Sequence, residues 1–345
     1  MTFSGYAFYQ ILGYYFTSGV DPNIAFLSIF GLRYTRVLVH SVVYFFYRAA
    51  PVPAKPSITA GDVTVVVATI DPTERNFIEA IASICRTGPN TIIVVTVGAQ
   101  REASATQNLA LLQSLYPNIT FRITHTAQAN KRQQIALAAG LITTPITFLV
   151  DASVFWNPNF LTSALAAFED ATVYLVGTNK RVQLTTRDNL DRLLPLGFIF
   201  NFFGSTYLSR HNFEIRASNT MDGGLFAVSG RTLGIRTKFL QDQEIMKGFT
   251  NERVSNYFGS YIPALNQPLL PDDDNYLTRQ VFNKGHKVKI QYTEDARVEI
   301  AGGQFTYPRY LDQCLRWARS TFRSNVASLV TERMALCSPG LDCGK

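Results

Sequence analysis

Between residues 60 and 150, runs of β-branched residues alternate with segments whose apolar positions recur at helical spacing. The runs that predict strands buried in a sheet are 62–70, 91–97, 120–124 and 145–150. The segments with helical spacing are 73–87, 104–116 and 130–142. Strands that alternate with helices indicate an α/β fold with a mostly parallel sheet and right-handed crossovers.

Charged residues follow the strands at positions where such sheets bind ligands, beyond the carboxyl ends. Asp71 follows the first strand and Asp151 ends the fourth. Asp151 is suited either to a divalent cation that neutralises phosphates or to capping the next turn. Lys131 and Arg132 lie in the first turn of a predicted helix, where cations oppose the helix dipole. They are either solvated surface charges or the partners of a bound diphosphate.

The second half of the chain carries three further candidate segments. Ser229-Gly230-Arg231 is either a plain turn or a place where a substrate approaches the backbone closely. The acids 272–274 precede a helical run, where they complement the helix dipole or raise one another's pKa toward that of a general base. In the predicted helix 308–325, Gln313, Arg316 and Trp317 share one face. That face either packs in an ordinary amphipathic helix or offers an indole to a sugar ring.

The amino-terminal segment 24–47 is long enough to cross a bilayer but holds Arg33 and Arg36 near its middle. Its aliphatic and aromatic residues favour insertion by roughly 4 to 8 kcal/mol, and two central arginines oppose it by about 5 to 7 kcal/mol. We therefore expect a helix in the headgroup layer rather than a spanning one. The proline-rich segment 50–56 predicts a spacer and a domain boundary.

The composition and charge of the chain exclude several classes of protein and of binding partner. Of 345 residues, 47% are hydrophobic and 17% charged, which excludes a disordered chain, a collagen and a coiled coil. The net charge of +7 favours anionic ligands or a membrane surface over a nucleic-acid partner. The four cysteines and four histidines form no CxxC or HExxH pattern, so neither a disulfide framework nor a zinc site is predicted.

Taken in order, these motifs resemble the processive, membrane-associated members of glycosyltransferase family 2, the cellulose, chitin, hyaluronan and fungal capsule-type polysaccharide synthases. QCLRW at 313–317 fits the family's Gln-x-x-Arg-Trp signature, and DDDNYLTR at 272–279 looks like its acidic catalytic motif. NKRQQIALA at 130–138 looks like its Lys-Arg donor motif. The resemblance covers about residues 60 to 325.

The resemblance implies a GT-A fold, a UDP-linked sugar donor, and direct displacement with inversion at the anomeric carbon. It implies that Asp274, with Asp273 beside it, deprotonates the acceptor hydroxyl. It implies donor-binding roles for Asp71, Lys131, Arg132 and Asp151, with Asp151 also holding Mg²⁺ or Mn²⁺. The residues that it places at the acceptor and the diphosphate are Ser229, Gly230, Arg231, Gln313, Arg316 and Trp317.

Three features depart from the family pattern. Ser153 stands where a second metal-binding acid is expected, and a hydroxyl is a poor substitute for a carboxylate ligand. The second strand runs into TVGAQ, where relatives carry a nucleoside-binding acid. The chain also stops twenty residues after Asn325, where processive relatives continue into membrane helices, so it looks truncated.

From these features we expect an amino-terminal interfacial segment with its linker (1–56), a GT-A catalytic domain (57–305) and an interfacial helix with a tail (306–345). We expect a membrane-associated enzyme whose catalytic domain faces the cytoplasm and whose partners are a UDP-sugar, a glycan acceptor and a membrane surface, without nucleic acid. The alternative is a catalytically degenerate relative that serves as a membrane-associated partner or regulator, motivated by the lost second acid.

Overall fold

The structure is a computed structural model of the whole chain. The residues that it describes are 21–183, 195–253, 268–269, 272–301, 308, 310–316 and 318–319.

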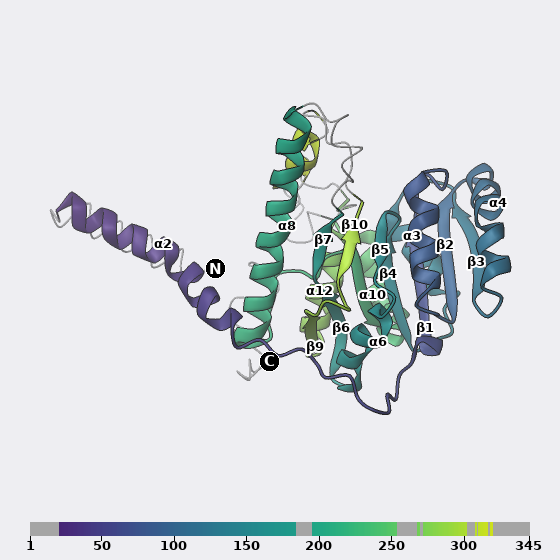
Figure 1. Cartoon of the computed structure of the whole chain (residues 1–345), viewed down its shortest axis with the longest axis horizontal. Helices are drawn as coiled ribbons and strands as arrows, with labels where there is room; N and C mark the ends of the chain where they lie inside the picture. The colour runs from purple at the N-terminus through teal and green to yellow at the C-terminus, as the bar shows by residue number, and fades with distance from the viewer. Residues whose placement is uncertain are drawn as a thin grey trace.

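A seven-stranded sheet forms the centre of the molecule, in the order β3-β2-β1-β4-β8-β6-β9 (Figure 1). Its strands are β1 (Val63–Ala68), β2 (Thr91–Val97), β3 (Thr120–Thr126), β4 (Ile146–Asp151), β6 (Val173–Thr178), β8 (Thr232–Arg236) and β9 (Lys287–Gln291). Neighbouring strands are parallel except at β8, which runs antiparallel to both β4 and β6. The expected mostly parallel α/β sheet is therefore confirmed, with one reversed strand in its interior.

Side chains of β1 alternate between two cores, as a pleated strand between two layers requires. Val63, Val65 and Val67 pack into one apolar cluster with helices α3 (Arg75–Cys85), α4 (Ala99–Leu115) and α6 (Phe160–Leu165), while Val66 faces a second cluster. The helices of that second cluster are α5 (Lys131–Ala139), α9 (Thr237–Leu240), α10 (Gln243–Asn251) and α12 (Asp273–Asn283). Burial on both faces explains why the strands read as continuous apolar runs.

A small second sheet, β5-β10-β7, lies beside the carboxyl ends of the main sheet (Figure 1). Its strands are β5 (Val154–Trp156), β7 (Lys180–Val182) and β10 (Val298–Ile300). Two short 3₁₀ helices, Ala60–Asp62 and Ala166–Glu169, complete the body. The long helix α8 (Pro195–Asp222) packs along β7 and β9.

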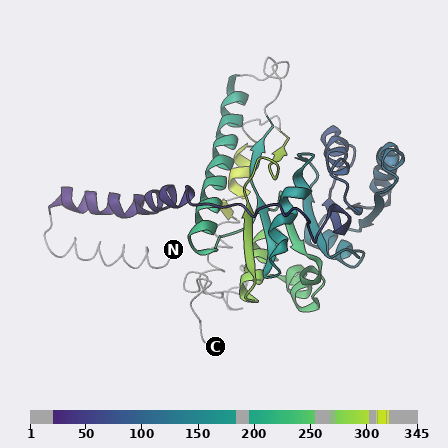
Figure 2. The same ribbon diagram turned by 60° about the horizontal axis from the view of Figure 1, so that its bottom comes forward.

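Helix α2 (Pro22–Tyr44) projects from the body and exposes apolar side chains on most of its length (Figures 1 and 2). By length and composition, Asn23–Tyr44 is the single helix among the described residues that is apolar enough to cross a membrane. Such a helix near the amino end also fits a signal sequence, so this property alone assigns no location.

The carboxyl end of α2 is joined to the body by aromatic residues. Tyr44 stacks on Phe213 of α8 at 5.3 Å between ring centroids. Tyr47 donates a hydrogen bond to the Ile290 carbonyl oxygen at 2.7 Å and accepts one from the Tyr292 N–H at 2.7 Å. Residues near the expected linker therefore pack on β9, although sequence placed the boundary after them.

Candidate active site

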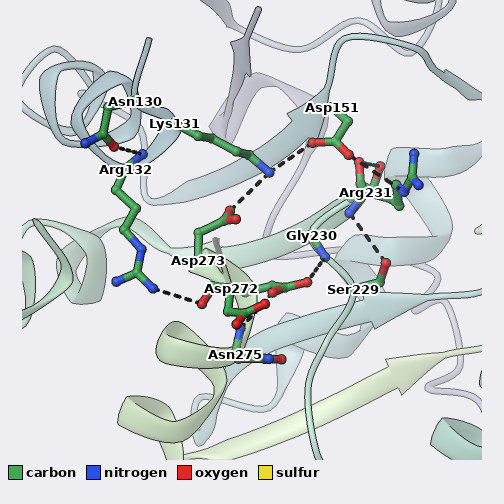
Figure 3. A network of polar contacts seen from close by, with 12 residues as sticks. Asn130, Lys131, Arg132, Asp151, Ser229, Gly230, Arg231, Asp272, Asp273 and Asn275 are labelled. Atoms are coloured by element: carbon green, nitrogen blue, oxygen red, sulfur yellow. Dashed lines mark hydrogen bonds and ion pairs between the residues drawn. The ribbon is translucent and has the colours of Figure 1, made fainter. Parts of the chain in front are cut away.

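The candidate site lies at one edge of the sheet, because parallel strands bring their carboxyl ends together there. β4 ends at Asp151, and antiparallel β8 begins at the same edge, directly after Ser229-Gly230-Arg231. Helices α5 and α12 begin there as well, with Lys131 and Asp273 in their first turns. Side chains from segments far apart in the sequence therefore meet in one network (Figure 3).

Lys131 lies at the centre of this network. Its Nζ is 2.9 Å from Asp151 Oδ1 and 3.1 Å from Asp273 Oδ2. The Asn130 side chain caps α5 by accepting from the N–H groups of Arg132 and Gln133, which fixes the start of the helix. Burial acts to lower the pKa of Lys131, but the charges of Asp151 and Asp273 outweigh it and raise that pKa above its ordinary value. Lys131 is therefore a permanent cation at neutral pH.

Asp151 faces cations with both of its oxygens. Arg231 Nε lies 3.8 Å from Oδ2, on the side opposite Lys131. Burial acts to raise the pKa of Asp151, but Lys131 and Arg231, with a contribution from Arg316, hold it below its ordinary value. The charge of Arg316 thus acts on Asp151 from the helical segment 310–316, although the two residues are far apart in sequence.

The described residues do not form a ready site for a divalent cation. No group of three or more His, Cys, Asp or Glu side chains within them is arranged to hold a metal ion. Asp151 already has two cationic neighbours, and Ser153 supplies a hydroxyl where a second carboxylate was expected. The assignment of Asp151 as a ligand of Mg²⁺ or Mn²⁺ stays a prediction.

Asp274 lies across the site from β4 and is held by the loop before β8. The Gly230 N–H donates to Asp274 Oδ2 at 2.7 Å. Burial and the neighbouring Asp273 charge raise the pKa of Asp274 to about 6, while Lys131 and the Gly230 hydrogen bond oppose that rise. A carboxyl group with this pKa is ionised at neutral pH and is a stronger base than an ordinary aspartate.

Gly230 is required for this approach between loop and helix. A Cβ atom at Gly230 would lie 3.1 Å from Asp274 Oδ2 and 3.3 Å from Asp274 Cγ, tighter than ordinary contact. The close backbone approach that the sequence suggested at Ser229-Gly230-Arg231 is thus made to the candidate base itself. The Arg231 N–H points to Ser229 Oγ at 3.5 Å, and the Arg231 carbonyl accepts from the Asp151 N–H at 3.0 Å.

Asp71 makes its hydrogen bonds within its own turn. Asp71 is exposed, and its Oδ1 accepts hydrogen bonds from the N–H and hydroxyl of Thr73 at 2.9 and 2.5 Å. These bonds lower the pKa of Asp71. It follows β1, whose Ala68 pairs with Asp151, so it belongs to the same edge without contact to Lys131. Gln313 is partly buried in the helical segment 310–316, and Trp317 lies outside the described residues.

The position of Arg132 does not fit the role that the sequence predicted for it. Arg132 was expected to bind a diphosphate beside Lys131, yet its side chain is only 1% exposed. Its guanidinium points away from Lys131 and toward Asp272 (Figure 3). In the interior it pairs with Glu252 at 2.6 Å. Successive side chains of a helix differ by about 100° in direction, so Lys131 and Arg132 point to different sides of α5. Direct binding of a donor does not fit this burial.

Lys180 is a candidate that sequence reasoning missed. It lies just beyond the carboxyl end of β6, is 5% exposed, and its Nζ is 3.1 Å from His211 Nδ1. Burial lowers the pKa of Lys180 to about 7, with Asp274 opposing and Arg231 adding to the effect. The charge of Asp274 therefore reaches Lys180. The available signal was a cation shortly after an apolar strand run, VYLVGTNK.

Comparison with known proteins agrees with this geometry. A family model described as "Glycosyltransferase like family 2" matches residues 60–320. A Type 2 glycosyltransferase from Pyricularia oryzae is 38% identical over 309 residues, which cover 90% of this chain and 59% of that protein. The NDP-glycosyltransferase ltbB of Aspergillus luteorubrus is 29% identical, over 88% of this chain and 69% of that protein.

A solved structure with a related arrangement is the mannosyltransferase PcManGT from Pyrobaculum calidifontis in complex with GDP-Man and Mn²⁺. It has a TM-score of 0.49 and 13% identity, and the match covers 92% of this chain and 86% of that one. The chain spans 59% of the length of its relative from Pyricularia oryzae, which is less than two thirds. The family match extends over most of the described residues, from the first strand to the helical segment that carries Arg316. The chain therefore belongs to glycosyltransferase family 2 and has the GT-A-like α/β fold of that family.

Proposed function

We propose that this protein transfers a sugar from a nucleoside diphosphate donor, UDP-linked as the motifs suggest, to the hydroxyl of a glycan acceptor. The observation that carries the proposal is the meeting of a basic carboxylate, Asp274, with the cation Lys131 at the edge of the sheet. Asp273 links the two, because its charge raises the pKa of Asp274 while its carboxylate contacts Lys131.

The reaction is a single displacement with inversion. Asp274 accepts the proton of the acceptor hydroxyl while that oxygen forms a bond to the anomeric carbon. The bond from this carbon to the diphosphate oxygen breaks, and the nucleoside diphosphate departs with the electron pair. Lys131 and Arg231 supply positive charge where the diphosphate accumulates negative charge. The chain's part in catalysis is alignment, one base and charge neutralisation.

The name of one relative supports a nucleotide-sugar donor, since it is described as an NDP-glycosyltransferase. The direct test is a panel of UDP- and GDP-sugars, incubated with the purified protein and a glycan acceptor, with nucleoside diphosphate release as readout. We expect release with at least one donor, increased by acceptor. Absence of release with every donor, in the presence and absence of Mn²⁺, would count against the proposal.

A second candidate function is that of a non-catalytic partner at a membrane, favoured by Ser153 in place of a second acid. Calorimetry with UDP separates the two functions, because a working donor site binds the nucleotide. A Ser153→Asp variant adds a control. Turnover gained only in that variant would identify the natural protein as a degenerate enzyme, whereas turnover by the natural protein excludes this second function.

Location at a membrane is part of the same proposal. Helix α2 presents exposed apolar residues such as Phe26, Leu27 and Leu38 together with the exposed Arg33 and Arg36. This combination suits a helix in the headgroup layer with its arginines on anionic lipid. We propose that the catalytic domain then works on the cytoplasmic side, where nucleotide sugars are available.

A further inference from the structure

Three charged residues form a buried cluster beside the candidate site, where α5, α10 and α12 meet. Glu252 Oε2 is 2.6 Å from Arg132 Nη2, and Glu252 Oε1 is 2.5 Å from Arg279 Nη2. The three residues are 1 to 4% exposed. We call Arg132, Glu252 and Arg279 the buried arginine–glutamate cluster.

The groups around the cluster stabilise the positive charge of Arg132. Arg132 Nη1 donates to the Phe249 carbonyl at 2.8 Å, in the last turn of α10, where the helix dipole is negative. The Arg132 guanidinium also lies over the rings of Phe249 and Tyr276, at 5.1 and 5.6 Å from their centroids. Aromatic faces attract a desolvated cation. Arg132 is therefore built into the interior rather than directed at a ligand.

Arg132 also contacts the residue that precedes α12, through a backbone carbonyl. Arg132 Nη2 donates to the Asp272 carbonyl oxygen at 3.2 Å, and that oxygen also accepts the first helical bond of α12, from the Tyr276 N–H at 3.1 Å. Asp272 has a φ of +70°, and no other non-glycine residue of the described chain has a positive φ. Aspartate adopts this left-handed conformation more readily than most residues, but less readily than glycine. A contact that holds Asp272 in it also orients Asp273 and Asp274, which follow directly.

We propose that the buried arginine–glutamate cluster is a positioning device for the catalytic base, in which Arg132 fixes the first turn of α12 so that Asp273 reaches Lys131 and Asp274 reaches Gly230. Arg132 acts through Asp272 and makes no contact with the donor. The proposal rests on the function proposed for Asp274.

The matched pair of variants is Arg132→Met and Lys131→Met, two neighbours in one helix turn. Arg132→Met leaves Glu252 paired with Arg279, so the carboxylate keeps a buried cationic partner. Arg132→Lys keeps the charge but loses the fork of donors and serves as a milder second variant. Each variant is measured by calorimetry with UDP, by transfer rate at saturating donor, and by thermal unfolding to check that it is folded.

We expect Arg132→Met to lower kcat by about 10- to 100-fold through a displaced base, with a nucleotide Kd within about twofold of the natural protein. Lys131→Met should instead weaken nucleotide binding by about tenfold or more, since a charge-assisted contact is lost. Arg132→Lys should show the same pattern as Arg132→Met, more weakly. A nucleotide Kd weakened by Arg132→Met as much as by Lys131→Met, with kcat unchanged, would overturn the proposal.

Relief of the backbone strain provides an independent test. Glycine adopts a φ of +70° without cost. In the Asp272→Gly variant the conformation at position 272 therefore depends less on the contact with Arg132. Added to Arg132→Met, Asp272→Gly should restore kcat several-fold, and no recovery would contradict the positioning role. Failure of the natural protein to turn over any donor would count against the proposed function. The two calorimetric Kd values would still decide whether Arg132 binds the nucleotide.

Discussion

Asp274 is the residue on which the proposed chemistry depends. Its carboxylate is held by the Gly230 N–H, and burial together with Asp273 raises its pKa to about 6. A base with this pKa is mostly ionised at neutral pH and still accepts a proton more readily than an ordinary aspartate. The acid side of the pH dependence of transfer should therefore report on Asp274.

We expect the transfer rate to rise with pH through a midpoint near 6, because Asp274 must lose its proton before it can act as a base. The measurement is kcat from pH 5 to pH 8 at saturating donor and acceptor. A rate that is already maximal at pH 5, with its acid limb near the ordinary aspartate value of 3.8, would contradict this environment for Asp274.

The raised pKa of Asp274 also predicts that its ionised carboxylate destabilises the folded state. Between pH 3.8 and about 6 the folded state binds more protons than the unfolded state, so the free energy of unfolding falls as pH rises through this window. Asp274→Asn removes the charged form. It should raise the free energy of unfolding at pH 8, by at most about 3 kcal/mol, and leave it unchanged near pH 3.5.

Thermal or urea unfolding at the two pH values measures this difference. Asp295→Asn, at an exposed carboxyl group outside the site, is the control and should change little at either pH. Equal stability of Asp274→Asn and the natural protein at pH 8 would show that the Asp274 charge is not destabilising.

At the scale of elements, the site depends on how closely the loop before β8 approaches the first turn of α12. Gly230→Ala would place a methyl group 3.1 Å from Asp274 Oδ2, so the carboxylate must shift by a few tenths of an ångström. We expect the transfer rate to fall by about tenfold, with UDP binding unchanged, because only the base is displaced.

Gly140→Ala is the matched control. Its added Cβ would lie 3.7 Å from the nearest atom, an ordinary contact at the end of α5. Both variants are compared by transfer rate and by calorimetry with UDP. A Gly230→Ala variant as active as Gly140→Ala would show that the contact between loop and helix does not position the base.

Much of the amino-terminal half of the sheet was predictable, because β1, β2 and β4 bury both faces and read as uninterrupted apolar runs. The edge strand β3 is exposed or partly buried along its length and was recognised from its short alternating run. The strand β8 was not predicted, since its short run TLGIR contains Gly234, whose missing side chain makes room for Phe148 and Phe168. The three-residue strands β5, β7 and β10 exist through pairing between distant segments. A local pattern cannot show such pairing.

The site was predictable to a similar extent. Lys131, Asp151, Asp273 and Asp274 were named from their motifs, and the structure brings them into one network. The direction of Arg132 was not predictable, because its partner Glu252 lies 120 positions away and carries no recognisable motif. Lys180 was missed for a related reason, since its burial depends on α8 and on its contact with His211.

At the scale of the whole molecule, an α/β body carries a projecting apolar helix (Figure 2). The contacts of Tyr44 with α8 and of Tyr47 with β9 fix the carboxyl end of α2 on the body. If α2 lies in the headgroup layer, the body is held beside a membrane surface.

The prediction is that the protein floats with vesicles containing anionic lipid and is released by high salt. Arg33→Gln with Arg36→Gln should weaken this binding by roughly 25-fold, about 1 kcal/mol for each arginine. Vesicles of neutral lipid are the control. Binding that is independent of lipid charge and resists alkaline extraction would indicate a spanning helix instead, and absence of binding would contradict membrane association.

The most direct test of the account compares the natural protein with Asp274→Asn in two parallel measurements, release of nucleoside diphosphate from a donor sugar and calorimetric binding of UDP. We expect the variant to bind UDP with an unchanged Kd and to lose release by a thousandfold or more, roughly the contribution of a positioned base. Release by Asp274→Asn at the natural rate would contradict the assignment of Asp274 and, with it, the proposed site.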